Sequence, residues 1–304
     1  MKKILVIKLG ALGDFVQATA AFDAIRKHHK DAHITLLTTK GMMPFAHNHP
    51  AFENVLVDER LKPFNLNYLM KLRSQLKGYD LVYDLQTNDR TNYLYYFLAG
   101  RPAWCGIAPT CQFKQTNPNR KNMHTLDRLA DQIAVAGVQN MGQPNLLYAA
   151  TESETLVQKH NLNLNKLILL VPGGSAHRPE KRWGSFANLA NVLIEKGYQV
   201  ALIGAGAEEV LLKDIVKEAP KAINLCNQTT IGQLIDLSSK CLCVIGNDTG
   251  PMHIAVASGA KGVTLFGSAS DPKRCAPRGE GVHVLHKSQI DAITTPEIVK
   301  TLAL

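Results

Sequence analysis

The chain has 304 residues, of which 45% are hydrophobic and 19% charged, so it is long enough for two domains with separate cores. Its first apolar run covers residues 4–7 and ends at Lys8. A secretory signal needs an apolar stretch of about 7–15 residues, and a membrane-spanning helix needs about 20. We therefore expect a cytoplasmic protein whose first apolar run is a buried strand.

The formal net charge is +9, from 34 Lys and Arg against 25 Asp and Glu. A basic surface favours nucleic acids, phosphorylated substrates or anionic membranes, although it also simply keeps a protein soluble. The chain has no long Lys/Arg block and no nucleic-acid motif, so no nucleic-acid partner is expected. Its six cysteines form no Cys-x-x-Cys pair, which predicts free thiols and no metal site.

Short apolar runs alternate with amphipathic stretches along the chain. In the first half we expect strands at 4–7, 33–38, 55–57 and 81–85, and helices at 15–28, 65–77, 89–99 and 126–135. The alternation lapses at 140–150, a stretch of Gly, Gln, Pro and Asn. In the second half we expect strands at 167–171, 199–203, 242–245 and 262–266, a helix capped by Ser185, and helices at 208–217, 231–239, 251–258 and 296–302.

This alternation predicts the α/β class, with one doubly wound parallel sheet in domain 1–145 and another in domain 146–304. In such sheets, ligands bind beyond the carboxyl ends of the strands, and pockets favour domain interfaces. The active site is therefore expected in a cleft between the two halves.

The first candidate motif is Lys-Leu-Gly-Ala-Leu-Gly-Asp at 8–14, between a predicted strand and a predicted helix. Gly10 and Gly13 allow a tight turn. The G-x-G-x-x-G fingerprint is absent, and no acidic residue closes the second strand, which argues against NAD. Asp14 can take a proton from an acceptor hydroxyl, or it can cap the helix, with Gln17 completing a capping box.

The second motif, at 171–183, reads Val-Pro-Gly-Gly-Ser-Ala-His-Arg-Pro-Glu-Lys-Arg-Trp. Gly173 and Gly174 allow a ligand to approach the backbone, and the start of the following helix attracts anions. The basic side chains of this loop suit a diphosphate leaving group, whose charge must be stabilised. The alternative is a solvated charged loop.

The third motif, Gly-Asn-Asp-Thr-Gly-Pro-Met-His at 246–253, joins a strand to a helix whose first position suits Pro251. The N–H groups of that helix end can bind a pyrophosphate without a metal. Asp248 and Thr249 either hold the turn or contact the ligand. His253 either reaches a phosphate or a sugar hydroxyl, or packs behind the site.

Isolated charges provide weaker candidates. Glu208 and Glu209 follow a predicted strand and either accept hydrogen bonds from ribose hydroxyls or begin the next helix. Arg90, Arg101 and Arg128 in the first half either bind an acidic acceptor or are surface charges.

These three motifs, in this order within two α/β halves, resemble glycosyltransferase family 9, the ADP-heptose heptosyltransferases of lipopolysaccharide core synthesis. The matching stretches are 4–14, 80–86, 171–183, 202–209 and 244–268, the last containing VIGNDTGPMHIAVASGAKGVTLFG. The resemblance implies a GT-B fold and an inverting transfer from a nucleotide sugar, with no cofactor and no metal. It assigns acceptor binding to 1–145 and nucleotide-sugar binding to 146–304.

The resemblance also implies individual roles. Asp14 would be the general base, and Lys181 would hold the donor phosphates. The remaining donor-site residues would be Ser175, Glu208, Asp248, Thr249, Gly250 and His253. Lys8, Gly13 and Arg128 are expected at the acceptor site, although the family's first loop often has Arg at the position of Lys8.

The implied acceptor is an acidic glycolipid at the cytoplasmic face of the inner membrane, which would bring the enzyme into peripheral contact with that membrane. Two alternatives stay open. The chain can use another nucleotide sugar or another acceptor, such as a protein or an O-antigen intermediate, or it can bind nucleotide without transfer. Protein-directed relatives are expected to carry a cysteine-rich metal finger, which the cysteine spacing does not support.

Overall fold

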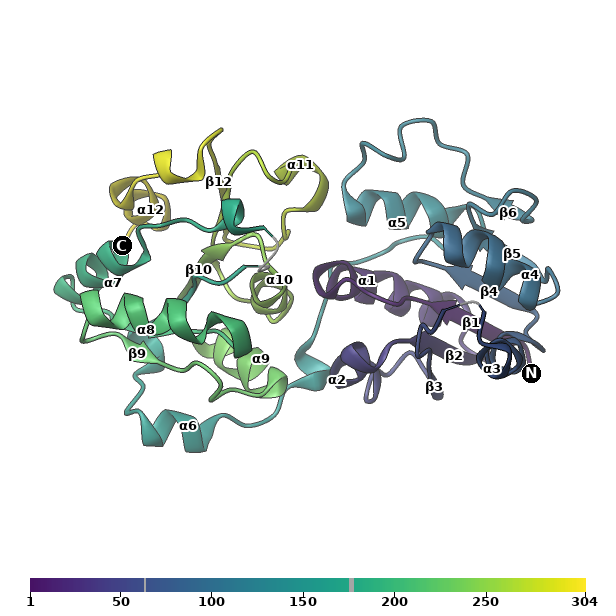
Figure 1. Cartoon of the computed structure of the whole chain (residues 1–304), viewed down its shortest axis with the longest axis horizontal. Helices are drawn as coiled ribbons and strands as arrows, with labels where there is room; N and C mark the ends of the chain where they lie inside the picture. Colours follow the sequence, from purple (N-terminus) through teal and green to yellow (C-terminus); the bar gives the residue numbers. More distant parts are fainter. Residues whose placement is uncertain (63, 175–177) are drawn as a thin grey trace. The chain divides into compact units, whose positions relative to one another are not determined.

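The computed structural model describes residues 1–62, 64–174 and 178–304. The chain divides into two compact units, Met1–Pro144 (unit 1) and Asn145–Leu304 (unit 2). Each unit holds one six-stranded parallel sheet covered by helices (Figure 1). The predicted α/β class with two doubly wound sheets is thereby confirmed.

The sheet of unit 1 has the strand order β3-β2-β1-β4-β5-β6. Its strands are β1 (Lys3–Ile7), β2 (His33–Thr38), β3 (Asn54–Val57), β4 (Leu81–Asp84), β5 (Ala103–Gly106) and β6 (Phe113–Lys114). The central strand β1 is an uninterrupted apolar run because helices cover both faces of the sheet. The sequence analysis missed β5, whose four residues Ala-Trp-Cys-Gly hold no run of branched apolar side chains, and β6, which has only two residues.

Two pairs of helices cover the two faces of this sheet. The helices of unit 1 are α1 (Leu12–His28), α2 (Met43–Ala46), α3 (Leu66–Leu76), α4 (Tyr96–Leu98) and α5 (Thr125–Ala134), with a 3-10 turn at Lys40–Met42 and a π-helical stretch at Arg90–Tyr95. Helices α1 and α5 pack on each other, whereas α3 and α4 share a core cluster with Leu5, Ile7 and Val82. The predicted helix 89–99 forms, but its first part, Arg90–Tyr95, is a π-helix, which is wider than an α-helix.

The sheet of unit 2 has the order β12-β11-β10-β7-β8-β9. Its strands are β7 (Leu167–Val171), β8 (Gln199–Leu202), β9 (Ile223–Asn224), β10 (Cys243–Asn247), β11 (Gly262–Phe266) and β12 (Val282–His286). The sequence analysis missed the edge strands β9 and β12. The first has two residues, and the second is only partly buried, so neither has the apolar run of a central strand.

The described part of unit 2 contains the five predicted helices and two short helices, Glu154–Lys159 and Pro272–Cys275, that the sequence analysis missed. They are α6 (Glu154–Lys159), α7 (Phe186–Glu195), α8 (Glu209–Glu218), α9 (Ile231–Lys240), α10 (Gly250–Ala257), α11 (Pro272–Cys275) and α12 (Thr295–Leu302), with 3-10 turns at Leu147–Ala149, Leu164–Lys166, Pro179–Lys181, Gly206–Glu208 and Ile290–Ala292. The predicted apolar face of α7 is buried against β7 and β8.

Three details of the sequence analysis are settled by local geometry. Helix α1 begins at Leu12, so Asp14 lies inside its first turn and the predicted cap with Gln17 is wrong. Ser185 precedes α7, but its side chain makes no capping hydrogen bond. All six cysteines are free thiols, as predicted. Among the described helices, none has the length and apolar character needed to cross a membrane.

Candidate active site

In unit 2, the loops of the second and third motifs and the loop that carries Glu208 leave the sheet at one edge. Strand β7 lies between β10 and β8, and Val171 pairs with Gly246 while Leu170 pairs with Leu202. The strands are parallel, so the loops that follow them all leave at the carboxyl edge. This edge is where doubly wound sheets bind their ligands. The donor-site residues predicted around 173, 208 and 248 are therefore neighbours in space.

Asn247 holds the Pro-Gly-Gly loop in place. This fully buried residue ends β10, and its Nδ2 donates to the carbonyl oxygens of Pro172 at 2.8 Å and Gly173 at 3.2 Å. Its Oδ1 accepts a hydrogen bond from the backbone N–H of Trp183 at 3.1 Å. The sequence analysis quoted Asn247 within its motif but gave it no role. A polar residue at the end of an otherwise apolar strand was the available signal.

The two loop glycines leave room for neighbouring side chains. A Cβ on Gly173 would lie 1.7 Å from Oε1 of Glu208, so the carboxylate of Glu208 lies directly against the loop backbone. Its Oε2 accepts a hydrogen bond from the N–H of Ala205 at 3.1 Å. A Cβ on Gly174 would lie 3.3 Å from Cγ of Arg182 and 3.8 Å from Cγ2 of Thr249. Glu208 and Arg182 thus flank the loop after β7.

Lys181 and Asp248 form a largely buried ion pair. The Nζ of Lys181 donates to Oδ2 of Asp248 at 2.7 Å, and Nε2 of His253 lies 3.6 Å from Oδ1. Burial opposes the charge on Asp248, but His253 and Lys181 together hold the pKa of this carboxyl below its usual range. Asp248 is therefore an anion that fixes Lys181 at the carboxyl edge of the sheet.

Buried polar atoms at this edge lack partners. Thr249 precedes α10 without capping it, and its Oγ1 has no hydrogen-bond partner in the described part of the chain. The same holds for Nε of Arg182, although its Nη2 donates to the carbonyl oxygen of Gly174 at 2.9 Å. Gly250 begins α10, whose N-terminal N–H groups attract anions. Ser175, also predicted at this site, lies outside the described residues.

Unit 1 has a second polar cluster, at the carboxyl edge of β1 and β4. These strands are paired, with Ile7 opposite Asp84. The amino group of the buried Lys8 donates to the carbonyl oxygen of Leu85 at 3.4 Å. Burial lowers the pKa of Lys8, the nearby carboxylates of Asp14 and Asp84 oppose that effect, and the Arg128 guanidinium adds to it. Lys8 thus lies near Asp14, the predicted base, and near Arg128, which was predicted together with Lys8 at the acceptor site.

The remaining predicted residue of this set, Gly13, lies in the first turn of α1 beside Asp14. The loop before it turns at Gly10, which has a φ of +132°, a conformation that residues other than glycine rarely adopt. The N–H of Leu9 donates to Oε1 of Gln86 at 2.9 Å, which ties this loop to the one after β4. The position of Asp14 is therefore set by the first turn of α1 and by the preceding loop, which is hydrogen-bonded to Gln86.

Asp84 is a fully buried carboxyl group beneath this cluster. Its Oδ1 accepts hydrogen bonds from the N–H groups of Gln86 at 3.1 Å and Thr87 at 3.0 Å. Its Oδ2 is buried without a partner among the described atoms. Burial raises the pKa of Asp84 to about 6, against the effect of those hydrogen bonds and of Lys8. The sequence analysis placed Asp84 in a matching stretch but gave it no role.

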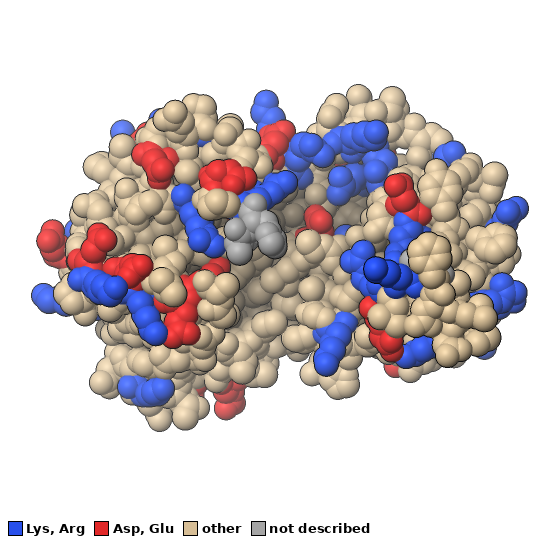
Figure 2. Space-filling model, viewed as in Figure 1, with Lys and Arg blue, Asp and Glu red and all other residues tan. Residues whose placement is uncertain are grey.

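Arg120 is a further cation that the sequence analysis missed. Its Nη2 donates to Oγ1 of Thr87 at 2.6 Å, and its Nε donates to Oε1 of Gln115 at 2.6 Å. Burial lowers the pKa of Arg120, and the neighbouring Arg128 lowers it further. Figure 2 shows Lys and Arg side chains gathered over the start of α5 and the loop before it. Nothing in the sequence around Arg120 distinguishes it from a solvated loop residue.

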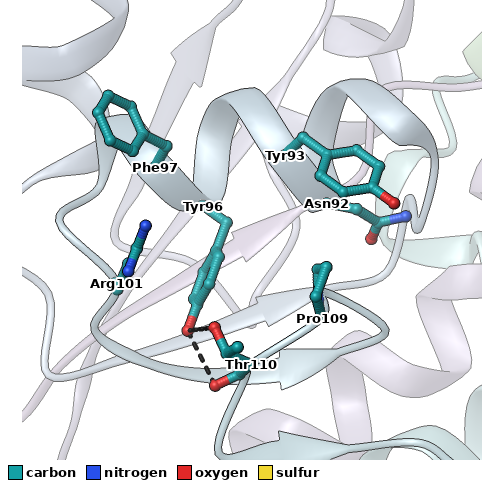
Figure 3. Close-up of a pocket in the computed structure, with 7 residues that line it drawn as sticks. All are labelled: Asn92, Tyr93, Tyr96, Phe97, Arg101, Pro109 and Thr110. Atoms are coloured by element: carbon teal, nitrogen blue, oxygen red, sulfur yellow. Dashed lines mark hydrogen bonds between the residues drawn. The ribbon is translucent and has the colours of Figure 1, made fainter.

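The two other arginine candidates of unit 1 are placed differently. The guanidinium of Arg90 donates to the hydroxyls of Tyr95 and Tyr68 and to the carbonyl oxygen of Leu61, so Arg90 braces the fold. Arg101 lines a cavity of about 330 Å³ between the 92–97 helical stretch and the loop at 109–110 (Figure 3). The hydroxyl of Tyr96 in this cavity already donates to the carbonyl oxygen of Thr110 at 3.1 Å. The cavity presents no carboxylate to act as a base.

Two doubly wound parallel sheets, each with a polar cluster at its carboxyl edge, are the architecture of the GT-B fold. The model of glycosyltransferase family 9 (heptosyltransferase) matches residues 69–301, which is more than half of the chain. The chain therefore belongs to glycosyltransferase family 9, and it is an enzyme of the glycosyltransferase type. The resemblance expected from the motifs is confirmed.

Curated relatives cover nearly the whole chain. Lipooligosaccharide heptosyltransferase 2 of Haemophilus ducreyi is 24% identical, over 99% of this chain and 98% of the relative. Lipopolysaccharide heptosyltransferase 2 of Escherichia coli is 25% identical, over 88% of this chain and 83% of the relative. This chain is therefore similar to both relatives over most of their length.

Solved structures share the fold. A glycosyl transferase family 9 protein from Veillonella parvula superposes with a TM-score of 0.87 at 23% identity, over 99% of this chain and 96% of that chain. The ADP-heptose lps heptosyltransferase II of E. coli has a TM-score of 0.78 at 21% identity, over 100% of this chain and 98% of that chain. Among the described residues of our chain, no group of three or more His, Cys, Asp or Glu side chains could hold a metal ion.

Proposed function

We propose that this enzyme transfers a heptose from ADP-heptose to an acidic acceptor of the lipopolysaccharide inner core, with inversion and without a metal. The observation that carries the proposal is the cluster of Lys181, Asp248, Glu208 and two loop glycines at one sheet edge in unit 2. Family membership and the names of the curated relatives support a heptose donor and a lipopolysaccharide or lipooligosaccharide acceptor.

Unit 2 would bind the donor. A diphosphate needs cations and N–H donors, which Lys181 and the start of α10 supply. The hydroxyl of Thr249, which has no hydrogen-bond partner among the described atoms, would add a further donor. The carboxylate of Glu208, held beside Gly173, would accept hydrogen bonds from the ribose hydroxyls. His253 would contact the phosphate or the sugar, and Asp248 would keep Lys181 in place until the phosphates arrive.

Unit 1 would bind the acceptor and supply the base. The acceptor oxygen forms a bond to the anomeric carbon of the heptose while the bond from that carbon to the ADP oxygen breaks. The acceptor's proton passes to the carboxylate of Asp14, and ADP leaves with the bonding electrons. Attack from the face opposite the leaving group inverts the anomeric centre. Lys8 lies near Asp14, and Arg128 and Arg120 would bind the acidic groups of the acceptor.

Calorimetric titration with ADP, UDP, GDP and NAD, in buffer containing a chelator, tests the donor assignment. We expect ADP to bind more tightly than the other three nucleotides, and we expect its affinity to be the same with and without the chelator. A preference for UDP or GDP would keep the reaction type and reject ADP-heptose, and a requirement for a divalent metal would reject the metal-free mechanism. Transfer to a de-heptosylated core fragment, followed by NMR of the new anomeric centre, then tests the acceptor and the inversion.

A further inference from the structure

Thr87, in the loop after β4, has a backbone conformation that β-branched residues rarely adopt. Its φ is +47°, in the left-handed region that glycine and asparagine occupy far more readily. Strained positions of this kind persist only where the surrounding structure holds them, and they gather at functional sites. Thr87 must therefore be held in place by its neighbours.

The buried carboxyl group of Asp84 holds this turn. Its Oδ1 accepts hydrogen bonds from the N–H of Thr87 at 3.0 Å and from the N–H of Gln86 at 3.1 Å. Asp84 is itself fixed at the end of β4, because its backbone carbonyl oxygen accepts a hydrogen bond from Nε2 of the buried Gln132 at 2.8 Å. The side chain of Asp84 thus closes a short turn over residues 84–87 and keeps Thr87 in its left-handed conformation.

The turn directs the hydroxyl group of Thr87 at a cation. Oγ1 of Thr87 accepts a hydrogen bond from Nη2 of Arg120 at 2.6 Å, although the two residues are 33 positions apart in sequence. On its other side, Nε of Arg120 donates to Oε1 of the buried Gln115 at 2.6 Å. Gln115 is held in turn by Asp131, whose Oδ2 accepts from its Nε2 at 2.6 Å. Two nitrogens of the Arg120 guanidinium are therefore held, and Nη1 has no hydrogen bond among the described atoms.

The same turn also contacts the loop that precedes Asp14. Oε1 of Gln86 accepts a hydrogen bond from the N–H of Leu9 at 2.9 Å, and the hydroxyl of Thr39 donates to the carbonyl oxygen of Leu9 at 3.0 Å. Leu9 lies three residues before the start of α1, whose first turn carries Asp14. Through two adjacent residues, the carboxyl group of Asp84 is therefore connected both to the loop of the proposed base and to a cation of the proposed acceptor site.

We infer that Asp84 and Thr87 are positioning residues for the acceptor: Asp84 holds the turn, and the Thr87 hydroxyl orients the Arg120 guanidinium toward an acidic group of the acceptor. A guanidinium binds a carboxylate or a phosphate best when its planar fork is already oriented, because less side-chain freedom is then lost on binding. A glycine would adopt the same φ without strain, but it has no hydroxyl group to accept a hydrogen bond from Arg120. The inference rests on the proposed function, because it takes the acidic acceptor from it.

Thr87→Gly separates positioning from stability. Glycine relieves the left-handed strain, which offsets the extra freedom that it gives to the unfolded chain, so the melting temperature should change little. The acceptor KM should nevertheless rise about two- to tenfold in the transfer assay, the range expected for one hydrogen bond, while turnover and ADP affinity stay the same. Thr87→Ser keeps the hydroxyl group and should restore the wild-type KM. A purely structural role for Thr87 predicts an unchanged KM in the folded Thr87→Gly variant, and that result would overturn the inference.

A double-mutant cycle shows whether Thr87 acts through Arg120. Arg120→Ala should raise the acceptor KM, and Thr87→Gly should raise it no further in that background, because the contact is already lost. Asn161→Gly is the matched control, since Asn161 is an exposed residue of unit 2 with the same φ of +47°. This control should leave the acceptor KM unchanged. Additive effects of Thr87→Gly and Arg120→Ala would contradict the inference.

Two substitutions of Asp84 test the residue that holds the turn. Asp84→Asn keeps an oxygen that can accept hydrogen bonds from the N–H groups of Gln86 and Thr87, so the acceptor KM should stay within about twofold of the wild-type value. Asp84→Ala removes that oxygen and should raise KM at least as much as Thr87→Gly does. The same KM in both Asp84 variants would overturn the role of Asp84. If Asp84→Ala does not fold, the comparison of Thr87→Gly with Thr87→Ser decides the inference.

The failure of this inference is distinguishable from the failure of the proposed function. If the wild-type protein transfers no sugar to an acidic acceptor, the proposed function fails, and the reactivity of Arg120 then decides whether Thr87 orients it. Phenylglyoxal modifies guanidinium groups, and mass spectrometry measures the rate at each arginine. Arg120 should react several-fold faster in Thr87→Gly than in the wild-type protein, whereas the exposed Arg60 should react at the same rate in both. An equal rate for Arg120 in the two proteins would overturn the inference.

Discussion

Each unit carries a buried carboxylate at the carboxyl edge of its sheet, beside its central strand, but the two carboxylates are held in opposite ways. Asp84 ends β4, beside the central strand β1, and Asp248 follows β10, beside β7. Burial raises the pKa of Asp84 to about 6, and one of its oxygens has no partner among the described atoms. The pKa of Asp248 lies below its usual range, because His253 and Lys181 outweigh its burial.

We propose that this difference lets one topology serve two kinds of ligand. In unit 2 the cation Lys181 is already paired with Asp248, so an incoming diphosphate must either share Lys181 with Asp248 or replace Asp248 as its partner. In unit 1 the cations Lys8 and Arg120 both lie near Arg128, and neither Lys8 nor Arg120 is ion-paired with a carboxylate in the described part of the chain. The first arrangement suits a nucleotide that must later leave as ADP, and the second suits an acidic acceptor.

The largest expected effect concerns the base in unit 1. Asp14→Asn should lower turnover by about 10²–10⁴, the scale of losing a general base, while ADP affinity stays within about twofold. Turnover is measured in the transfer assay and affinity by calorimetry. Asp31→Asn, an exposed carboxylate beyond the end of α1, is the matched control. Unchanged turnover in Asp14→Asn would show that Asp14 is not the base.

The pH dependence of folding should separate Asp84 from Asp248. A carboxyl group with a raised pKa in the folded state binds its proton more tightly there than in the unfolded chain. Its contribution to stability is present below the ordinary pKa of 3.8 and is lost as the pH rises through about 6. Relative to Asp84→Asn, the wild-type protein should therefore lose roughly 2–3 kcal/mol of unfolding free energy between pH 4 and pH 7.

Urea unfolding at several pH values measures this difference. Asp248 supplies the internal contrast, since its lowered pKa gives stability that is present above pH 3.8 and lost as the pH falls below it. The wild-type protein compared with Asp248→Asn should thus show the opposite slope, at lower pH. Equal slopes for the two pairs would mean that the two carboxylates do not differ as the structure indicates.

The next effect concerns the paired cation of unit 2. Lys181→Ala should weaken ADP binding about 10–100-fold, because a charged hydrogen bond to phosphate contributes roughly 1.5–3 kcal/mol. Acceptor KM should change little, because the acceptor is assigned to unit 1. Lys166→Ala, at an exposed lysine of the same unit, is the control in the same titration. An unaltered ADP affinity would leave Lys181 with a structural role as the partner of Asp248.

Arg120 gives the corresponding test in unit 1. Arg120→Ala should raise acceptor KM about tenfold and leave ADP affinity unchanged, since it removes one contact to an acidic group. Lys121→Ala changes the neighbouring exposed cation and should have a much smaller effect. If both variants raise KM equally, the effect is general electrostatic attraction, and Arg120 makes no specific contact.

The smallest effect tests the close approach at Gly173. In Gly173→Ala the new Cβ would lie 1.7 Å from Oε1 of Glu208, so Glu208 must move away from its present position. Losing one hydrogen bond to ribose should weaken ADP binding about fivefold. Gly142→Ala is a fitting control because no atom lies within 4 Å of its Cβ position. If ADP binds Gly173→Ala as tightly as the wild-type protein, Glu208 does not contact the nucleotide.

The sequence by itself determined the fold class, the places of the central strands along the chain and the motif loops that follow those strands in unit 2. Each of those motifs is one contiguous run that directly follows a buried strand, so its place at the carboxyl edge follows from the alternation of strands and helices. The sequence analysis missed edge strands such as β6 and β9, because a strand of two residues is too short to show an alternation of apolar and polar positions.

Only the tertiary structure decided how the charges in these sites are held. Leu9 and Gln86 are 77 residues apart in sequence, and Arg120 is 33 residues from Thr87, yet each pair is hydrogen-bonded. The opposite pKa shifts of Asp84 and Asp248 depend on burial and on neighbours contributed by other segments. Local sequence cannot encode them, because a carboxylate's charge state is set by the groups packed around it in space.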